Sequence, residues 1–218
     1  MMYKACIFDL DGTLTDTLES LTYSVNETLK EMELPEITSE QCRSFVGNGA
    51  RFLMEKAVSV SGEEHLSRLE EAMERYGRIF DANCTYRVVP YPGILSMLEE
   101  MRAEGLALAV LSNKPHKQAV HVVEEIFGKD VFQIIQGQKE NVPRKPDPMA
   151  ALQIAEELHA TPEETVYIGD SEVDVTTGLA AGMHTIAVSW GFRNRQVLEE
   201  AGARYIAKDP KEIIGWIK

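Results

Sequence analysis

The sequence is poor in cysteine and has no long apolar run, and each of these absences excludes a class of protein. Three Cys among 218 residues are odd in number and widely spaced, so no disulfide framework is expected and a reducing, cytoplasmic location is predicted. No apolar stretch approaches the ~20 residues that cross a bilayer, and the first residues lack the pattern of a signal peptide. We therefore expect no membrane partner.

Basic residues are also scarce, with 22 Lys and Arg against 35 Asp and Glu, which gives a net charge of -13. A field of this sign repels nucleic acid, so nucleic acid is not an expected partner. It repels small phosphate esters as well, and an anionic substrate would need a local cation. The apolar fraction of 44% is ordinary for a folded chain, and 218 residues suffice for one core with a small second domain.

The spacing of apolar residues changes along the chain. Residues 3–8 are typical of a short buried strand, whereas residues 16–81 show helical spacing throughout, with one long amphipathic helix expected over 62–80 and Ser39 expected to cap an earlier one. From residue 94 onward, helices and strands alternate. Helices are predicted over 94–103, 115–127, 148–159, 173–182 and 196–201, and strands over 106–113, 131–137, 165–170, 184–191 and 203–207.

Repeated strand–helix units predict an α/β fold, a Rossmann-like doubly wound parallel sheet with helices on both faces, in a three-layer α/β/α arrangement. The helical stretch directly follows the first strand, and we interpret it as an inserted all-helical cap domain. The predicted boundaries are 1–15 and 85–218 for the catalytic core domain, and 16–84 for the cap domain.

Polar side chains stand where the predicted strands end. In a doubly wound sheet, ligands bind beyond the carboxyl ends of the strands, so these side chains are expected along one edge. The residues concerned are Asp9 and Asp11 after the first strand, Ser112, Asn113 and Lys114 after the second, Lys145 in a later loop, and Asp170 and Asp174 after the strand over 165–170.

The chemistry of these groups indicates phosphoryl transfer. Asp9, Asp11 and Asp170 would repel one another unless a hard cation such as Mg²⁺ lay between them. The hydroxyl of Ser112 and the ammonium of Lys145 can hold the remaining phosphate oxygens, and a carboxylate can serve as the nucleophile that forms an aspartyl phosphate.

Four segments resemble, in order, the motifs of the haloacid dehalogenase superfamily of phosphohydrolases. The first is Asp-x-Asp-Gly-Thr at 9–13, the second an apolar strand that ends in Ser112, the third Lys145 before Pro-Asp-Pro, and the fourth Gly-Asp-Ser-x-x-Asp at 169–174. Together they span nearly the whole chain, which makes the resemblance specific.

The resemblance implies a role for each matching residue. Asp9 would be the nucleophile and a metal ligand. Asp11 would be the general acid and then the base, and would bind metal through its backbone carbonyl. Asp170 would complete the Mg²⁺ ligands, and Asp174 would orient Asp170, water or Lys145, although a place in the first helical turn also explains it. The implied phosphate-binding residues are Ser112, Asn113 and Lys145.

The segment Val-Gly-Asn-Gly-Ala-Arg at 46–51 resembles the cap loop of the phosphoglycolate-phosphatase-like members. The candidates for contacts with the rest of the substrate are Gly47, Asn48, Gly49 and Arg51. Arg51 can equally be a solvated side chain, Lys114 can be a plain surface charge, and Arg193 is interpreted as structural or solvated.

The resemblance implies a Mg²⁺-dependent phosphatase that hydrolyses a small phosphate monoester, of the phosphoglycolate phosphatase type, acting as a monomer or homodimer on a small phosphorylated metabolite. A β-phosphoglucomutase-like phosphomutase and an inorganic pyrophosphatase on the same core are alternatives. Leu21 stands where the mutases carry a His, and Asp11 is absent from dehalogenases; both features favour the phosphatase. A receiver-type signalling module would be shorter and lack the helical insertion.

Overall fold

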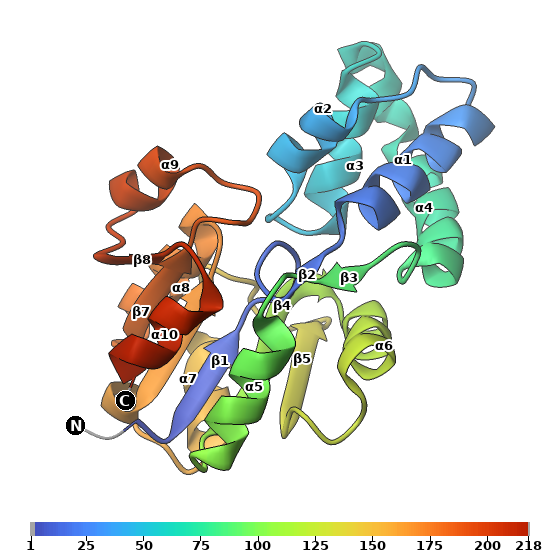
Figure 1. The fold of residues 1–218 in the computed structure, drawn as a ribbon. Helices are drawn as coiled ribbons and strands as arrows, with labels where there is room; N and C mark the ends of the chain where they lie inside the picture. Colours follow the sequence, from blue (N-terminus) through green and yellow to red (C-terminus); the bar gives the residue numbers. More distant parts are fainter. Residues whose placement is uncertain (1–2, 218) are drawn as a thin grey trace.

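A fully parallel sheet of six strands forms the centre of the computed structural model, which describes residues 3–217 (Figure 1). The strand order is β5-β4-β1-β6-β7-β8, and every neighbouring pair is parallel. The strands are β1 (Ala5–Phe8), β4 (Ala107–Pro115), β5 (Ile134–Gln138), β6 (Thr165–Gly169), β7 (His184–Val188) and β8 (Tyr205–Ala207).

Helices cover both faces of this sheet. One face packs against α5 (Ile94–Ala103), α6 (His116–Phe127) and α10 (Pro210–Ile217), and the other against α7 (Met149–Glu157), α8 (Glu172–Ala180) and α9 (Arg195–Glu200). A 3-10 turn, η2 (Pro162–Glu164), precedes β6. The predicted three-layer, doubly wound fold is confirmed, and the core elements agree with the sequence prediction to within three residues at their ends.

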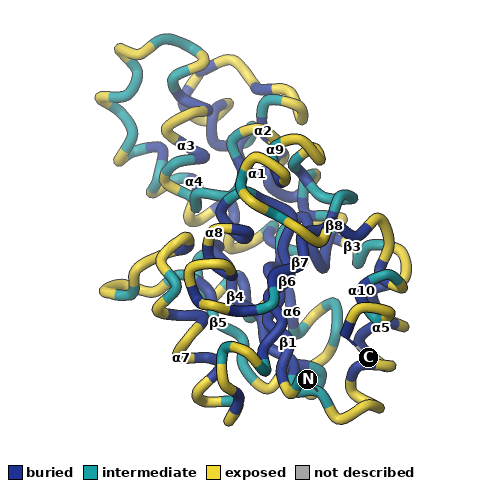
Figure 2. The backbone as a smooth tube through the Cα atoms, turned by 90° about the vertical axis from the view of Figure 1, so that its left-hand side faces the viewer, coloured by how far each residue is buried: buried dark blue, intermediate teal, exposed yellow. Residues whose placement is uncertain are grey.

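The central strands are apolar on both faces because both are covered. Cys6 and Phe8 face the α5 side, and Ile7 between them faces α7, as the two-residue period of a strand requires. All of β1 is buried, and Figure 2 shows the central strands as the most buried part of the backbone. Burial of each large apolar side chain stabilises the fold by about 1.5–3 kcal/mol, so the residues at the strand ends are held by a well-packed core.

Four helices form a separate bundle beyond the carboxyl ends of the strands (Figure 1). They are α1 (Leu18–Glu31), α2 (Ser39–Phe45), α3 (Ala50–Ser59) and α4 (Leu69–Asn83), with a 3-10 helix, η1 (Glu63–Arg68), before the last. The chain enters and leaves this cap through two short antiparallel strands, β2 (Thr15–Asp16) and β3 (Val89–Pro90), which the sequence analysis did not anticipate. We retain the division at residues 15/16 and 84/85 as a proposal.

Two local predictions for the cap were wrong. The single helix expected over 62–80 is divided into η1 and α4, and Arg68 at the junction donates to the Met32 carbonyl and to Glu71, which fixes the break. The helix expected to be capped by Ser39 is capped by Thr38, whose hydroxyl accepts from the Gln41 backbone N–H while the Gln41 side chain accepts from Thr38 N.

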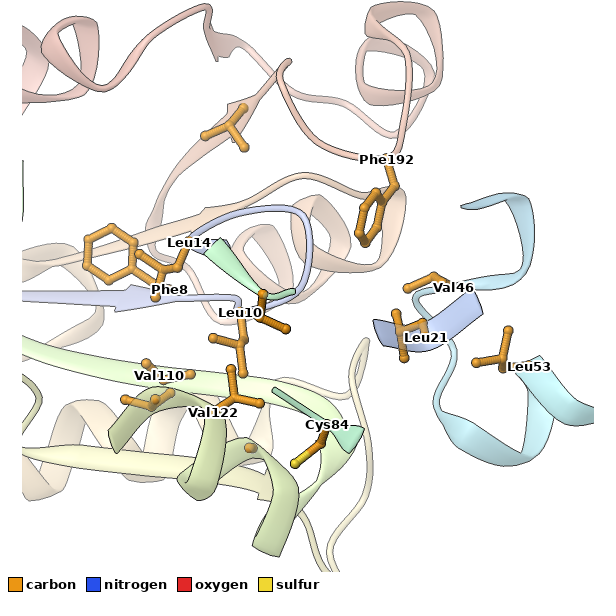
Figure 3. Packing of buried hydrophobic residues seen from close by; sticks show 14 of the residues in the cluster. Phe8, Leu10, Leu14, Leu21, Val46, Leu53, Cys84, Val110, Val122 and Phe192 are labelled. Carbon is orange, nitrogen blue, oxygen red and sulfur yellow. The ribbon is translucent and has the colours of Figure 1, made fainter. Parts of the chain in front are cut away.

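Apolar side chains also line the space between cap and core. Figure 3 shows Leu21, Val46 and Leu53 together on cap elements, with Phe192 on the core side facing them. All four are buried, and they belong to the same apolar cluster as Phe8. The cap therefore meets the core through packed apolar surface as well as through the two linking strands.

Candidate active site

The strand order reverses at β1. From β1 the chain builds outward to β4 and β5, then crosses to β6 on the opposite side of β1. Such a switch point is where open α/β sheets bind ligands. Asp9 follows β1, Ser112 lies in β4, and Asp170 follows β6, so the three groups meet at this point. They line a pocket of about 590 Å³, part of it open to solvent, which suits a small molecule.

Lys145 is at the centre of the site. Its ammonium is buried and donates to Asp9 Oδ1 and Asp174 Oδ1, each at 2.7 Å. Burial alone would lower the pKa of Lys145, but the carboxylates of Asp174 and Asp9 outweigh it and raise that pKa well above its usual value. Asn113 fixes the backbone here, since its Oδ1 accepts from Lys145 N at 3.0 Å and its Nδ2 donates to Lys145 O at 3.1 Å.

Asp174 is held from several directions. Its Oδ2 accepts from Ser171 Oγ at 2.5 Å and Ser171 N at 3.2 Å, and Ser171 caps α8 by accepting from Asp174 N. The two interpretations of Asp174 from the sequence, a place in the first helical turn and a contact with Lys145, both hold. One carboxylate oxygen belongs to a capping box, and the other accepts a hydrogen bond from Lys145.

Asp9 and Asp170 are buried carboxyls. Burial raises the pKa of Asp9 to about 7, with Lys145 opposing the shift and Asp174 adding to it. Burial, followed by the charges of Asp174 and Asp9, raises the pKa of Asp170 well above its usual value. Phe192 N donates to Asp170 Oδ2 at 2.6 Å and fixes its orientation.

The donor set fits a divalent cation. Oxygens of Asp9, Asp170 and Asp174 lie within 4.8 Å of one another, and among the described residues only Lys145 brings a cation into direct contact with them. Three carboxylates and one ammonium leave two negative charges, which a hard dication such as Mg²⁺ would balance. Protein donors reach both oxygens of Asp174 and also both oxygens of Asp170, where Phe192 N donates to Oδ2 at 2.6 Å and Thr13 Oγ1 to Oδ1 at 3.4 Å. Lys145 donates to Asp9 through Oδ1.

The side chain of Asp11 lies outside this cluster and forms an ion pair with Lys114. Lys114 Nζ donates to both carboxylate oxygens, at 2.8 Å and 3.1 Å. The Lys114 side chain is only 1% exposed, so the interpretation of this residue as a surface charge was wrong. Its ammonium also lies 4.9 Å from the centre of the Phe80 ring in the cap.

The structure brings some of the other predicted residues to the pocket. Ser112, Gly47 and Gly49 line it, and Ser112 Oγ accepts from Lys114 N at 3.2 Å. Asn48 and Arg51 do not line it. Asn48 accepts a hydrogen bond through its backbone carbonyl from Arg144, and Arg51 pairs with Glu70 at the cap surface.

Arg193, which the sequence analysis interpreted as structural or solvated, has a structural role. Its guanidinium donates to the Val46 carbonyl at 2.6 Å, to the Arg43 carbonyl at 3.1 Å, and to Glu172 at 2.9 Å. It thus ties the core to the loop that carries Gly47 and Gly49. The sequence around Arg193, Trp-Gly-Phe-Arg at 190–193, gives no indication that these backbone carbonyls are its partners.

Two glycines make room for Asp170. A Cβ at Gly12 or at Gly191 would collide with the Asp170 carboxylate, and Gly12 also has φ +90°, which other residues rarely adopt. The first of these glycines belongs to the Asp-x-Asp-Gly motif. The second lies in the loop after β7 and was not singled out from the sequence.

Comparison with known proteins decides the family. The sequence pattern of the haloacid dehalogenase-like hydrolases matches residues 6–188. The chain belongs to this family. The prediction of a haloacid dehalogenase superfamily hydrolase is therefore confirmed.

Relatives within the haloacid dehalogenase-like family support the predicted branch. The chain is 32% identical to phosphoglycolate phosphatase 1 of Pseudomonas aeruginosa over 91% of its length and 74% of that protein. It is 31% identical to the phosphoglycolate phosphatase of Rhodospirillum rubrum, over 99% of this chain and 91% of that protein. A crystal structure from Lactobacillus delbrueckii subsp. bulgaricus, 30% identical, superposes with a TM-score of 0.93 over 100% of this chain and 99% of that one.

Within residues 3–217, none of the helices has the length and apolar character needed to cross a bilayer.

Proposed function

We propose that the protein is a Mg²⁺-dependent phosphatase that hydrolyses a small phosphate monoester of the phosphoglycolate type through an aspartyl phosphate on Asp9. The observation that carries the proposal is the ion pair between Lys145 and Asp9, at 2.7 Å, inside a buried acidic cluster at the switch point of the sheet. The similarity to two phosphoglycolate phosphatases supports the choice of substrate class.

The chain's own residues suffice to assign the steps of the reaction. Asp9 attacks phosphorus in line and displaces the alcohol, and Asp11 gives that alcohol its proton. Water then attacks the phosphorus of the aspartyl phosphate, Asp11 takes a proton from this water, and Asp9 is released with inorganic phosphate. Throughout, Lys145 and the Ser112 hydroxyl hold the phosphate oxygens.

The metal has a defined place in this proposal. Asp9 and Asp170 would hold Mg²⁺, with the Asp11 backbone carbonyl as the third protein ligand that the family resemblance implies. When bound, Mg²⁺ neutralises the charge that the acidic cluster and the phosphate bring together. Asp174 would keep Lys145 beside Asp9, and Phe192 N would hold the Asp170 carboxylate in one orientation.

The pocket wall favours a phosphatase over a phosphomutase. Leu21, at the position where the mutases carry a His, lines the pocket with a buried apolar side chain. It offers no proton donor or acceptor to a sugar hydroxyl. The neighbouring cap residues Leu53 and Phe80 are apolar as well, so this wall is suited to excluding water from the first transfer.

Phosphate release from a panel of esters with Mg²⁺ tests the proposal. The panel holds 2-phosphoglycolate, pyrophosphate, glucose 1-phosphate, glucose 6-phosphate and a nucleoside monophosphate. We expect release from 2-phosphoglycolate to exceed the others, and to be abolished by chelation and by Asp9→Asn. Asp130→Asn, which changes an exposed Asp far from the pocket, is the matched control and should keep full activity.

Three outcomes separate the candidates. Preference for pyrophosphate would identify an inorganic pyrophosphatase instead. Conversion of glucose 1-phosphate to glucose 6-phosphate would identify a mutase. No release from any ester by folded, metal-loaded protein would refute the hydrolase proposal.

A further inference from the structure

The ammonium of Lys114 is a buried cation with unused hydrogen-bonding capacity. Its side chain is 1% exposed and it lines the pocket. An ammonium has three N–H donors, and the hydrogen bonds to Asp11 Oδ1 and Oδ2 occupy two of them. Among residues 3–217, no third acceptor is present; the next group is the face of the Phe80 ring, 4.9 Å away.

The other cations that line the pocket are more fully engaged. Lys145 is held between the carboxylates of Asp9 and Asp174. The guanidinium of Arg193 donates hydrogen bonds to Glu172 and to the backbone carbonyls of Arg43 and Val46 in the cap. Among the described cations that line the pocket, Lys114 is therefore the one whose ammonium or guanidinium pairs with the fewest residues, and it lies 4.9 Å from the centre of the Phe80 ring in the cap.

The surroundings of Lys114 strengthen any charge–charge contact made there. The cap residues Leu21, Leu53, Tyr76 and Phe80 line the pocket with largely apolar surface. Water is largely excluded from such a wall, and an ion pair in a low dielectric is worth more than one in water. An aliphatic substituent would leave the third N–H without an acceptor and a neutral amide would supply one, whereas a carboxylate would accept a stronger, charge-assisted hydrogen bond.

We infer that Lys114 is a specificity-determining residue that binds a carboxylate carried by the substrate next to its phosphate. The inference deepens the proposed function and rests on it. The substrate class is a short phosphorylated hydroxy acid, because Asp11 follows Asp9, the proposed nucleophile, by two residues. Ser112 Oγ, which is proposed to hold a phosphate oxygen, accepts a hydrogen bond from Lys114 N. The carboxylate must therefore lie within a few atoms of the phosphate.

The two pocket lysines also provide positive charge locally in a protein that is strongly acidic overall. The chain carries a net charge of -13, so a dianionic or trianionic substrate is repelled at long range. In this inference Lys145 neutralises charge on the phosphate, and Lys114 neutralises the charge of the carboxylate. Between them the pocket holds two buried ammonium groups, one for each end of a short substrate.

The test compares 2-phosphoglycolate with its carboxamide, a neutral molecule of nearly the same shape. For each, kcat/KM is measured in the wild type, Lys114→Met, Lys114→Arg and the exposed-lysine control Lys129→Met. We expect the wild type to prefer the carboxylate, and Lys114→Met to reduce that preference at least tenfold. Lys114→Arg should retain part of the preference, and Lys129→Met all of it. Because Lys114 also contacts Asp11, turnover of both esters will fall in Lys114→Met, and only the ratio reports recognition.

A binding measurement separates the inference from the proposed function. Asp9→Asn and Asp9→Asn/Lys114→Met, both with Mg²⁺, are titrated calorimetrically with the two compounds. A loss of carboxylate preference in the double variant supports the inference, whether or not the wild type hydrolyses either ester. If the wild type hydrolyses neither ester, only the proposed phosphatase activity is refuted. An equal preference with and without Lys114, or no preference in the wild type, would overturn the inference while leaving hydrolysis of other monoesters possible.

Discussion

The guanidinium of Arg193 in the core donates a hydrogen bond of 2.6 Å to the backbone carbonyl of Val46 in the cap. Val46 immediately precedes Gly47, which lines the pocket and whose own carbonyl accepts from Asn113 Nδ2 at 3.0 Å. The loop that encloses the non-phosphate end of the pocket is thus fixed by core side chains through its backbone. A sequence change within this loop can alter the pocket without losing these contacts.

Replacing Arg193 should loosen the cap loop. We expect Arg193→Met to lower kcat/KM by about 10- to 100-fold, chiefly through KM, because the loop loses its hydrogen bonds to the core while the reacting groups stay in place. The neighbouring Arg195, which is exposed and pairs with Glu199, supplies the control variant Arg195→Met. Equal KM values for the two variants would contradict the role assigned to Arg193.

Asp174 should matter through Lys145. In Asp174→Asn the ammonium of Lys145 loses one of two carboxylate partners, and we expect kcat to fall by about 10- to 100-fold with a smaller change in KM. The pH–rate profile should change with it, since Asp174 is one of the charges that raise the pKa of Lys145. Steady-state kinetics between pH 5 and 9 checks both. An unchanged kcat would show that Asp174 only caps α8.

The stability of the metal-free protein should depend on the ionisation of Asp9. Its pKa is raised from 3.8 to about 7, chiefly by burial, so the folded state binds this proton more tightly than the unfolded chain. The stability that this carboxyl contributes is complete below about pH 4 and is lost as the pH rises through 7. The gap between the two pKa values corresponds to about 4 kcal/mol.

Asp9→Asn removes this titration, and urea unfolding in chelator from pH 5 to 8 measures its effect. We expect the free energy of unfolding of the variant, relative to wild type, to rise with pH across this range. Added Mg²⁺ should stabilise the wild type more than the variant at pH 8, since a metal bound by the folded state alone stabilises it. A difference between the two proteins that stays constant with pH would contradict the assignment.

Gly191 should be needed for metal binding. In Gly191→Ala the new Cβ would run into the Asp170 carboxylate and the Gly12 carbonyl, so we expect the Mg²⁺ concentration for half-maximal activity to rise about 10- to 100-fold. Gly215→Ala in α10 is the matched control: nothing lies within 4 Å of its added Cβ. It should keep the metal affinity and stabilise the protein by about 0.5–1 kcal/mol. Equal metal requirements in both variants would refute the proposal.

Much of the core was predictable because its physical signals are local. Each strand is a short apolar run ended by a polar residue, and each reacting group stands directly after such a run, as Asp9 and Asp170 do. The rule that ligands bind at the carboxyl ends of parallel strands then places these groups together without any knowledge of strand order. The contact between Lys145 and Asp174, at 2.7 Å, is one of the three roles that the family resemblance implied for Asp174.

The partners of Lys114 and Arg193 could not be predicted, because they depend on contacts between segments that are far apart in the sequence. Nothing near Lys114 in the sequence shows that Asp11, 103 residues away, would bury it as an ion pair. Nor does the sequence around Arg193 show that its partners are backbone carbonyls of the cap, which carry no side-chain signature. For Arg51 the sequence left a ligand contact and a solvated side chain open, and the structure has the side chain exposed and paired with Glu70.

The two short strands that join cap and core have a mechanical consequence. Because Thr15 pairs with Pro90 and Asp16 with Val89, the chain segments that enter and leave the cap are paired side by side at one place. The same segment continues back to Asp11 through the hydrogen bond from Gly12 N to Thr15 O and the bridge between Asp11 and Thr15. A rotation of the cap about these strands would therefore also move the backbone that carries Asp11.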